Sequence, residues 1–525
     1  MSTQQEPLSD EVTPLLQSPP QDPYLWYSPQ RYLSPAIFVF PVALVARLSS
    51  SIPTSTTVYI VQQNVCRFYY RAHDPSRIPV EGPMPDELCD APGVQQQFSA
   101  VVASIGVLTG IACVIGYSVL SHLSSTYGRK PAIILVLALG LSSNVSLLLS
   151  TWHRVGEIAE VVLLVLWILF DSFASLFLFV FLATTYVVDL VDAENRSRLL
   201  SSVYGWGLLG GALAFSLGGI VTTQTHDVLL VFRAATVLNV LNLLFTIFFL
   251  PESFSKERRE ELRRRAAEET QHRQGGFFQM IISKLGAAFS PVRMLKPVYN
   301  QNTGKRNWRL VWCALHIFIG EIGSSYTPTI AVIFLTVKFN YKPDETGFIL
   351  AFISLAYAFT NTVIIPAIIP ALRPLYNRKV LRESDTGDQN TVSNGTDRID
   401  IHISVISWMA EMVGFLLFSY MTSTAGQYFA ISIVALGAGK APLFRSIVAA
   451  SVEPLKQGET IAAIEMVASI GMLISPLYMG IVFSASITTM PSLVFYCNGL
   501  IILMGMSLLF FIKDSDRYQA PTADQ

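Results

Sequence analysis

Long apolar stretches recur along the whole chain and are separated by shorter polar segments. A stretch of about 20 residues, folded as a helix, spans the roughly 30 Å hydrocarbon core of a bilayer. The pattern predicts twelve such helices, near residues 35–61, 97–121, 131–150, 158–187, 198–222, 228–250, 308–336, 346–369, 401–422, 426–449, 461–485 and 491–512. We therefore expect an all-α membrane protein that spans the lipid bilayer many times.

The composition supports this interpretation. Of the 525 residues, 51% are hydrophobic and 14% are charged, whereas about 25% of residues are charged in an average soluble protein. The formal net charge of −1 gives no indication of a nucleic-acid partner. Residues 1–33 are polar and contain several prolines, without the apolar core of a cleavable signal peptide. We expect them to form a disordered tail, and the first span to be an uncleaved anchor.

Lysine and arginine are concentrated on the side of the predicted spans that holds both ends of the chain. The positive-inside rule assigns this side to the cytosol. The segment 251–307 lies there between the sixth and seventh spans, and we expect a linker that includes a helix on the membrane surface. A second cytosolic insertion, 383–399, is rich in Ser, Asp, Asn, Thr and Gly and is expected to be disordered.

Six spans, a linker and six further spans suggest two related bundles around a site at the middle of the membrane. The expected units are an N-terminal bundle at 34–250, the linker, a C-terminal bundle at 308–513 and a cytosolic tail at 514–525.

Five ionisable residues lie deep inside the predicted spans. A charge at the centre of a membrane helix costs roughly 2.5–3.5 kcal/mol on insertion scales, so it rarely persists unless it is paired or faces water. The five occur in the first, fourth, seventh and tenth spans, at Arg47, Asp171, Glu321, Lys440 and Arg445. This regular spacing predicts a polar path through the membrane, which is typical of a transporter.

Asp171 and Glu321 are the candidates for proton exchange. A carboxyl group among apolar neighbours keeps its proton to a higher pH than in water, whereas a nearby cation favours its ionised form. Arg47 is the expected partner of Asp171. A contact that breaks and forms again would couple protonation to conformation, and the alternative is a static ion pair between two helices.

Lys440 and Arg445 are expected to give the second half a positively charged lining, which favours an anionic substrate. Arg445 could instead extend to the lipid headgroups. His316 is a further candidate for the cavity, with a hydrogen-bonded packing residue as the alternative. Glu411 and Glu465 also lie in or beside spans, and the sequence assigns them no role.

Cys66 and Cys89 both lie in the segment 62–96, the long loop on the non-cytosolic side. An oxidising compartment would allow them to form a disulfide, and the alternative is two free thiols in a mobile loop.

The N-terminal tail contains an acidic dileucine pattern formed by Glu11, Leu15 and Leu16. Such patterns direct proteins to the vacuole or lysosome, and the plasma membrane is the competing location.

The polar segments on the cytosolic side carry a set of glycines and charged residues, Gly116, Gly128, Arg129, Lys130, Asp189 and Arg196. This set resembles the signature motif of the major facilitator superfamily, and the resemblance covers about residues 34–513. The segment 441–445, Ala-Pro-Leu-Phe-Arg, is similar to the proton-coupled folate transporter branch, in which the position of Arg445 serves the substrate or the gate. The resemblance implies two six-helix bundles whose first, fourth, seventh and tenth spans line a central cavity.

One position departs from the motif of the family. An acidic residue normally stands a few residues before the second glycine and helps to hold the bundles together on the cytosolic side, but this chain has Ser124 and Ser125. Arg129 must therefore find another partner, for which Asp189 and Asp192 are the candidates.

These observations predict a secondary active transporter that moves a small organic solute by alternating access, coupled to protons. An organic anion is the expected substrate class, and a monomer is the expected state. One alternative is a pump that exports a drug or a secondary metabolite. Another is a receptor with a transporter fold that binds partners through 251–307 and 383–399. The sequence contains no catalytic constellation, metal-ligand spacing or nucleotide-binding loop, so we expect no enzyme, no cofactor and no ATP-driven pump.

Overall fold

The computed structural model describes residues 35–79, 82, 84–151, 156–225, 228–270, 291–300, 305–339, 341, 343–384, 396–486, 489–513 and 516–518. The predicted sorting signal at Glu11, Leu15 and Leu16 lies outside these residues. So do the predicted surface helix of the linker and most of the insertion at 383–399.

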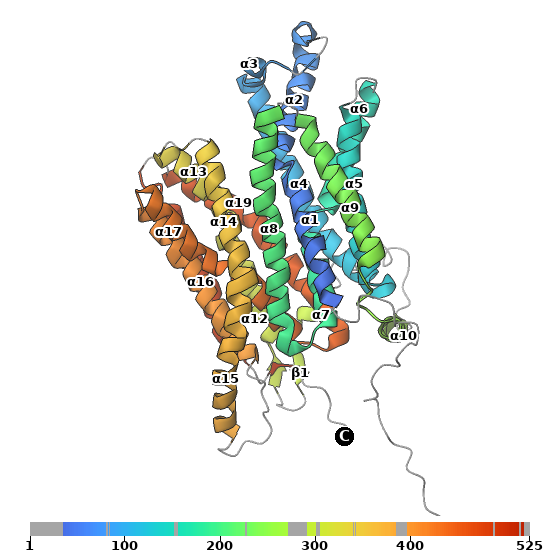
Figure 1. Ribbon diagram of the computed structural model, residues 1–525, viewed down its shortest axis with the longest axis vertical. Coiled ribbons are helices and arrows are strands. Elements are labelled where there is room, and N and C mark those ends of the chain that lie inside the picture. The colour runs from blue at the N-terminus through green and yellow to red at the C-terminus, as the bar shows by residue number, and fades with distance from the viewer. Residues whose placement is uncertain are drawn as a thin grey trace, which may run out of the picture.

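Helices account for nearly all of the described chain (Figure 1). The first half contains α1 (Val39–Ser51), α2 (Thr54–His73), α3 (Asp86–Cys89), α4 (Pro92–Tyr127), α5 (Arg129–Ser150), α6 (Glu157–Phe173), α7 (Leu176–Leu190), α8 (Ala193–Thr225) and α9 (Val228–Phe249), followed by α10 (Lys256–Thr270). The second half contains α12 (Arg309–Ser324), α13 (Thr327–Phe339), α14 (Pro343–Phe359), α15 (Ile365–Ser384), α16 (Thr396–Tyr420), α17 (Thr424–Ala435), α18 (Lys440–Ala449), α19 (Gln457–Ser486) and α20 (Leu493–Ser507).

Eleven helical segments of the described chain are long and apolar enough to cross a membrane, and a shorter apolar helix covers Ala36–Ser51. The predicted all-helical membrane fold is therefore confirmed. The shorter helix belongs to the predicted first span, which is interrupted at Ile52 and Pro53. A proline inside a helix removes a backbone hydrogen bond and clashes with the preceding turn, which explains why α1 does not run on into α2.

The other three spans that carry the intramembrane charges are interrupted as well. The fourth span divides into α6 and α7 at Ala174 and Ser175, and the seventh divides into α12 and α13 at Ser325 and Tyr326. The tenth consists of α17 and α18, joined by a short 3-10 helix at Leu436–Gly439. In a membrane, irregular backbone is tolerated where it is buried in protein or lines a cavity. The interruptions therefore indicate where the polar interior lies.

The two halves form two helical bundles that lie side by side in Figure 1, with α8 packed along α14 and α4 along α19. Glycines allow these helices to approach closely. A Cβ atom at Gly205 of α8 would lie 2.9 Å from the backbone nitrogen of Thr362, and one at Gly110 of α4 would collide with Leu473 of α19. Small residues at such crossings are typical of packed membrane helices.

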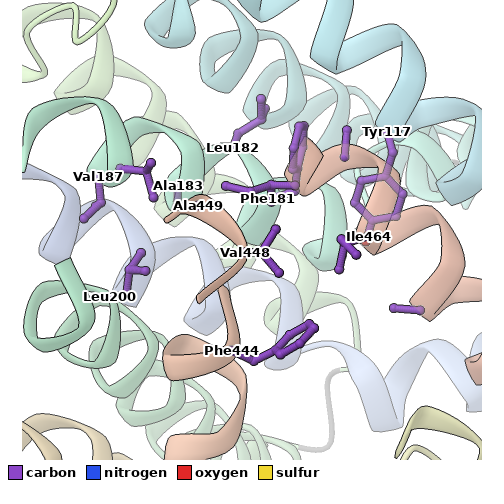
Figure 2. Packing of buried hydrophobic residues seen from close by; sticks show 14 of the residues in the cluster. Tyr117, Phe181, Leu182, Ala183, Val187, Leu200, Phe444, Val448, Ala449 and Ile464 are labelled. Atoms are coloured by element: carbon purple, nitrogen blue, oxygen red, sulfur yellow. The ribbon is translucent and has the colours of Figure 1, made fainter. Parts of the chain in front are cut away.

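Apolar side chains close the interface between the bundles on the side that holds α10, which we predicted to be cytosolic. Figure 2 shows Tyr117, Phe181 and Leu200 of the first half in one buried cluster with Phe444 and Ile464 of the second half. Each lies in the part of its membrane span that is nearer this face. The structure is therefore closed between the bundles on this side.

A short hairpin of β1 (Val298–Asn300) and β2 (Lys305–Asn307) precedes α12 and is a difference from the predicted all-helical chain. The amide of Asn307 donates to the backbone oxygen of Asp516 at 2.7 Å, and Arg309 donates to that of Lys513 at 3.0 Å. The hairpin thus connects the end of the linker to the C-terminal segment.

On the opposite face, a disulfide joins Cys66 in the second half of α2 to Cys89 in α3, with a Cα–Cα distance of 5.3 Å. Both cysteines are buried. Gln63 supports the same connection, because its side chain accepts a hydrogen bond from the Met84 backbone nitrogen at 2.8 Å and donates to the Met84 oxygen at 3.2 Å.

Replacing Cys89 by Ser is expected to destabilise this loop by about 3 kcal/mol, because the open chain regains conformational entropy. Alkylation of the native protein without reductant, followed by mass spectrometry, should label Cys66 in the Cys89→Ser variant but not in the parent. Cys113→Ser is the control and should leave Cys66 unlabelled. Labelling of Cys66 in the unreduced parent would contradict the disulfide.

Candidate functional site

A cavity of about 240 Å³ lies between the two bundles. Residues of α1, α7 and α8 line it from the first bundle, and residues of α12, α16, α18 and α19 line it from the second. Four of the five charged residues singled out in the sequence meet here, namely Arg47, Glu321, Lys440 and Arg445, and they are joined by Glu465. Interrupted spans from both halves thus converge on one polar site.

Aromatic side chains form much of the remaining wall, at Phe177, Phe179, Tyr204, Trp408 and Phe444. They come from both bundles, and they give the cavity a largely apolar surface with a few polar groups. Sites for small organic molecules generally combine these two features.

Lys440 has a carboxylate partner inside the second bundle. Its ammonium group donates to the carboxylate of Glu411 on α16 and lies 4.0 Å from the ring centroid of Trp408. The Glu411 side chain is only 4% exposed. The structure therefore provides a role for Glu411, which neutralises a cation that the low-dielectric interior would otherwise not accept.

Arg445 is paired in the same way. Its Nε donates to Oε1 of Glu465 on α19 at 2.6 Å, and its guanidinium carbon lies 5.0 Å from the ring centroid of Tyr204 across the interface. Arg445 therefore faces the cavity and not the headgroups. The predicted cationic lining of the second half is wrong, because each of its two cations has its own buried carboxylate.

Among the described residues, Arg47 has no such partner. It lines the cavity against Gly211 of α8, and its buried Nε has no hydrogen-bond partner among the described residues. The predicted contact with Asp171 is absent, because Asp171 accepts a hydrogen bond from Ser143 at 3.3 Å and lines a different cavity inside the first bundle. Leu176 and Phe179 line both cavities and separate the two charges.

Glu321 is the second charged side chain of the cavity for which the described residues give no hydrogen bond or ion pair. It lies where α12 and α19 approach closely, since a Cβ atom at Gly471 would be 2.7 Å from the backbone oxygen of Phe318. An unpaired carboxyl group in an apolar surrounding is suited to proton exchange.

His316 is a packing residue and also lines the cavity. It is fully buried, and its Nδ1 lies 2.7 Å from the backbone oxygen of Gly505, so this nitrogen must carry the hydrogen. Its ring meets that of Trp408 edge to face at 5.5 Å. Nε2 of His316 and Nε1 of Trp408 are both buried without a partner among the described residues. Buried polar atoms normally have one, so these two nitrogens are exceptions beside the cavity.

The signature loop after α4 is anchored within the first bundle. Arg129 donates from Nε to Asp189 at 2.7 Å and from Nη1 to Ser124 at 2.7 Å, and the Arg129 and Asp189 side chains are 3% and 2% exposed. Asp189, and not Asp192, is thus the partner of Arg129. Ser124 occupies the position of the missing acid and accepts from the same guanidinium.

Glu252, which follows the sixth span, also holds this loop in place. Its carboxylate accepts hydrogen bonds from the backbone nitrogens of Arg129 at 2.8 Å and Lys130 at 3.2 Å. Gly128 has a φ of +117°, and a Cβ atom there would collide with this carboxylate. Only glycine therefore fits at this position. Gly116 has a packing role, since a Cβ atom would lie 2.6 Å from Leu178 of α7.

Two charged contacts connect the bundles on this face. The Arg129 guanidinium lies against Gly458 at the start of α19, where a Cβ atom would be 2.6 Å from Nη2. Arg373 of α15 pairs with Glu194 of α8 at 2.7 Å. Arg196, the remaining residue of the signature set, is buried near this second contact. The contacts relate α4–α5 to α19 and α8 to α15, at corresponding positions of the two halves.

Three hydroxyl and carboxyl groups form a buried contact between the bundles that the sequence did not indicate. Ser197 of α8 donates to Asp400 of α16, and its oxygen lies 2.8 Å from that of Ser446 of α18. Serine is too common in membrane helices for this contact to be recognised from one sequence.

The profile of the family described as Major Facilitator Superfamily matches residues 84–380. The chain belongs to this superfamily. It is 32% identical over 413 residues to the "Major facilitator-type transporter psiT1" of Psilocybe cyanescens, covering 76% of this chain and 86% of that protein. It is also 22% identical over 421 residues to the "Tetracycline resistance protein, class C" of Escherichia coli, covering 78% and 85% of the two chains.

The chain is similar to a solved structure of the human organic anion transporter MFSD10 (TETRAN), with a TM-score of 0.62 and 17% sequence identity. The similarity covers 92% of this chain and 100% of that chain. At this identity the likeness shows the fold alone. Membership of the superfamily makes the protein a multi-pass membrane transporter and not an enzyme.

Replacing Glu465 by Gln is expected to destabilise the major facilitator chain by about 3–5 kcal/mol, because the buried Arg445 loses its carboxylate. The double variant Arg445→Met, Glu465→Leu should lose less stability than the sum of the losses in the two single variants. Unfolding of the purified protein in mixed micelles measures both. Glu194→Gln, at the exposed pair with Arg373, is the control and should change stability by about 0–1 kcal/mol. Equal effects of Glu465→Gln and Glu194→Gln would contradict the buried pairing.

Proposed function

We propose that the protein transports a small organic anion by alternating access and that protons drive the transport. The observation that carries the proposal is Arg47, the one cavity-lining cation without an acidic partner among the described residues. A buried guanidinium is stabilised when a carboxylate or phosphate binds it through two parallel hydrogen bonds. An anionic substrate would supply the charge that the protein does not.

The walls of the cavity support a substrate with an apolar or aromatic body. Trp408 and Phe444 on one side face Phe179 and Tyr204 on the other, in a cavity of about 240 Å³. The free indole N–H of Trp408 can donate to a polar group of the substrate. The anionic group at Arg47 and the apolar body would thus occupy different parts of the same site.

Glu321 provides the means of proton coupling. With Glu321 ionised, its charge offsets that of Arg47 in the shared cavity; with Glu321 protonated, Arg47 leaves a net positive site. Binding of a proton therefore favours binding of an anion, and by linkage the anion favours the proton to the same extent. A site that is most stable when it holds both favours movement of both in the same direction.

The contacts between the bundles, of Arg129 with Gly458 and of Ser197 with Asp400, support a cavity that opens alternately to each face. These contacts would have to separate when the bundles rock and the cytosolic side opens. The predicted domain boundaries, the monomeric state and a vacuolar or lysosomal membrane, based on Glu11, Leu15 and Leu16, belong to this proposal as well.

Export is the second candidate, and the similarity to a tetracycline resistance protein favours it. The direction of substrate transport depends on whether the substrate moves with the protons or against them. Reconstituted vesicles with an imposed gradient distinguish accumulation with protons from exchange against them. A receptor that does not transport is the third candidate, and any substrate flux through reconstituted protein would exclude it.

Arg47→Gln is expected to reduce uptake by proteoliposomes at least about tenfold, because the anion loses its only free cationic partner. Uptake should be measured for a panel of radiolabelled aromatic monocarboxylates and their uncharged amides. Arg47→Lys should retain part of the activity. Arg77→Gln, which removes an exposed cation outside the cavity, is the matched control. Uptake of the amides by the parent at the rate of the carboxylates would contradict the proposal.

Glu321→Gln is expected to abolish uptake driven by a pH gradient and to leave exchange of substrate at equilibrium, since the amide cannot take up or release the proton. Glu160→Gln, at the rim of α6, is the control and should retain the response. The comparison is made on the same vesicles with and without the gradient. A full response to the gradient in Glu321→Gln would exclude this residue as the proton site.

A further inference from the structure

A second cavity, of about 320 Å³, lies within the first bundle. Residues of α1, α2, α5, α6, α7 and α9 line it, so it is separate from the cavity between the bundles. The two cavities share only Leu176 and Phe179. Pro53 and Ala174, at the interruptions of the first and fourth spans, both belong to its wall. Its size lies within the range of about 300–1,000 Å³ that is usual for sites of small organic ligands.

Asp171 is the one ionisable group in the lining of this cavity. Ser143 donates a hydrogen bond to Asp171 at 3.3 Å, and no cation of the described residues forms an ion pair with this carboxyl group. Its side chain is exposed, although it lies in the middle of a predicted span. The proposed transport cycle makes no use of this carboxyl group. A carboxylate in the middle of a membrane span has an unfavourable free energy, so such a residue usually serves a function.

Three hydroxyl groups in the wall of this cavity direct their hydrogens to protein atoms. Ser49 donates its hydrogen to Asn239 at 2.8 Å or to the Ala46 oxygen at 3.1 Å, Ser50 donates to the Arg47 oxygen at 3.1 Å, and Thr57 donates to the Pro53 oxygen at 2.7 Å. Because protein atoms take these hydrogens, the hydroxyl oxygens retain free lone pairs. A ligand group that only donates, such as an ammonium group, matches this set.

Two amide side chains, Asn144 and Asn239, also belong to the wall, and the oxygen of Asn239 accepts the hydrogen of Ser49. The larger apolar side chains of the wall are Val136, Leu137, Trp167, Leu176, Phe179 and Phe232. A bare metal ion needs a close shell of oxygen ligands at about 2.3–2.6 Å, for which the cavity is too large and its wall too apolar. The combination of one carboxylate, several acceptors and an apolar surface fits a molecule with one positive charge and an apolar body.

We propose that this cavity is a second ligand site and that it binds a small organic amine in its protonated form, with the ammonium group on Asp171. The site is independent of the proposed anion site. Because Leu176 and Phe179 of α7 belong to both walls, a bound amine contacts the same side chains that bound the central cavity. Occupancy here can therefore affect transport without competition for the substrate position.

The test uses the full-length protein, purified in detergent, with benzylamine as the cationic probe and benzyl alcohol as its uncharged analogue. Binding is measured by calorimetry and by the rise in unfolding temperature. Asp171→Asn is expected to weaken binding of benzylamine roughly tenfold or more, because the ammonium group loses its carboxylate partner. Glu321→Gln makes the same change of carboxyl to amide in the central cavity. Its affinity for benzylamine should stay within about twofold of that of the parent.

Ala174→Leu provides an independent variant that retains Asp171 and fills part of the cavity, in case Asp171→Asn does not fold. It should also weaken binding roughly tenfold. Three results would overturn the proposal: binding lost in Glu321→Gln as much as in Asp171→Asn, benzyl alcohol bound as tightly as benzylamine, or no binding of benzylamine to the parent at millimolar concentration. The first would assign the amine to the central cavity, and the second would show that the charge of Asp171 does not select the ligand.

Discussion

The free energy of a charge in a low-dielectric interior determines how this protein is built. A buried ion must have a partner of opposite charge or face water, because its desolvation is otherwise too unfavourable. Lys440 meets this condition through Glu411, and Arg445 meets it through Glu465. On the face that holds α10, Asp189 does the same for Arg129. The residues that do not meet it within the protein are the ones that face a cavity.

The exceptions therefore carry more functional information than the pairs. Arg47 and Glu321 come from different bundles and face the same cavity, so their mutual attraction and their attraction for ligands change as the bundles move. The pairs of the second bundle, in contrast, lie between helices of that bundle and can remain intact during rocking. In the proposed cycle, a site that holds two unpaired charges of opposite sign responds both to an anion and to a proton. The pairs Lys440–Glu411 and Arg445–Glu465 are each neutral, so we expect them to respond to neither ligand.

The sequence predicted the helical fold, the two bundles and four of the five cavity charges, because hydropathy and charge depend on individual residues. It could not predict which charges meet. Glu411 and Glu465 lie 29 and 20 residues from their partners, on other helices, and pairing across helices depends on how the helices rotate about their axes. Asp171 illustrates the same limit. The spacing of the spans placed it beside Arg47, but the interruption between α6 and α7 directs it into the first bundle.

The interrupted helices explain why the charges and the cavities coincide. Each of the four spans with an intramembrane charge is broken, and each break leaves backbone groups without partners in the helix. Such groups are acceptable at this depth only beside protein or water, so a break and a buried charge favour the same place in the membrane. Pro53 breaks the first span and lines the cavity of Asp171, whereas Lys440 opens α18 directly after the break in the tenth span and lines the central cavity. A broken helix loses regular backbone hydrogen bonds. The backbone groups left at the break form a polar wall, which a straight apolar helix would not provide.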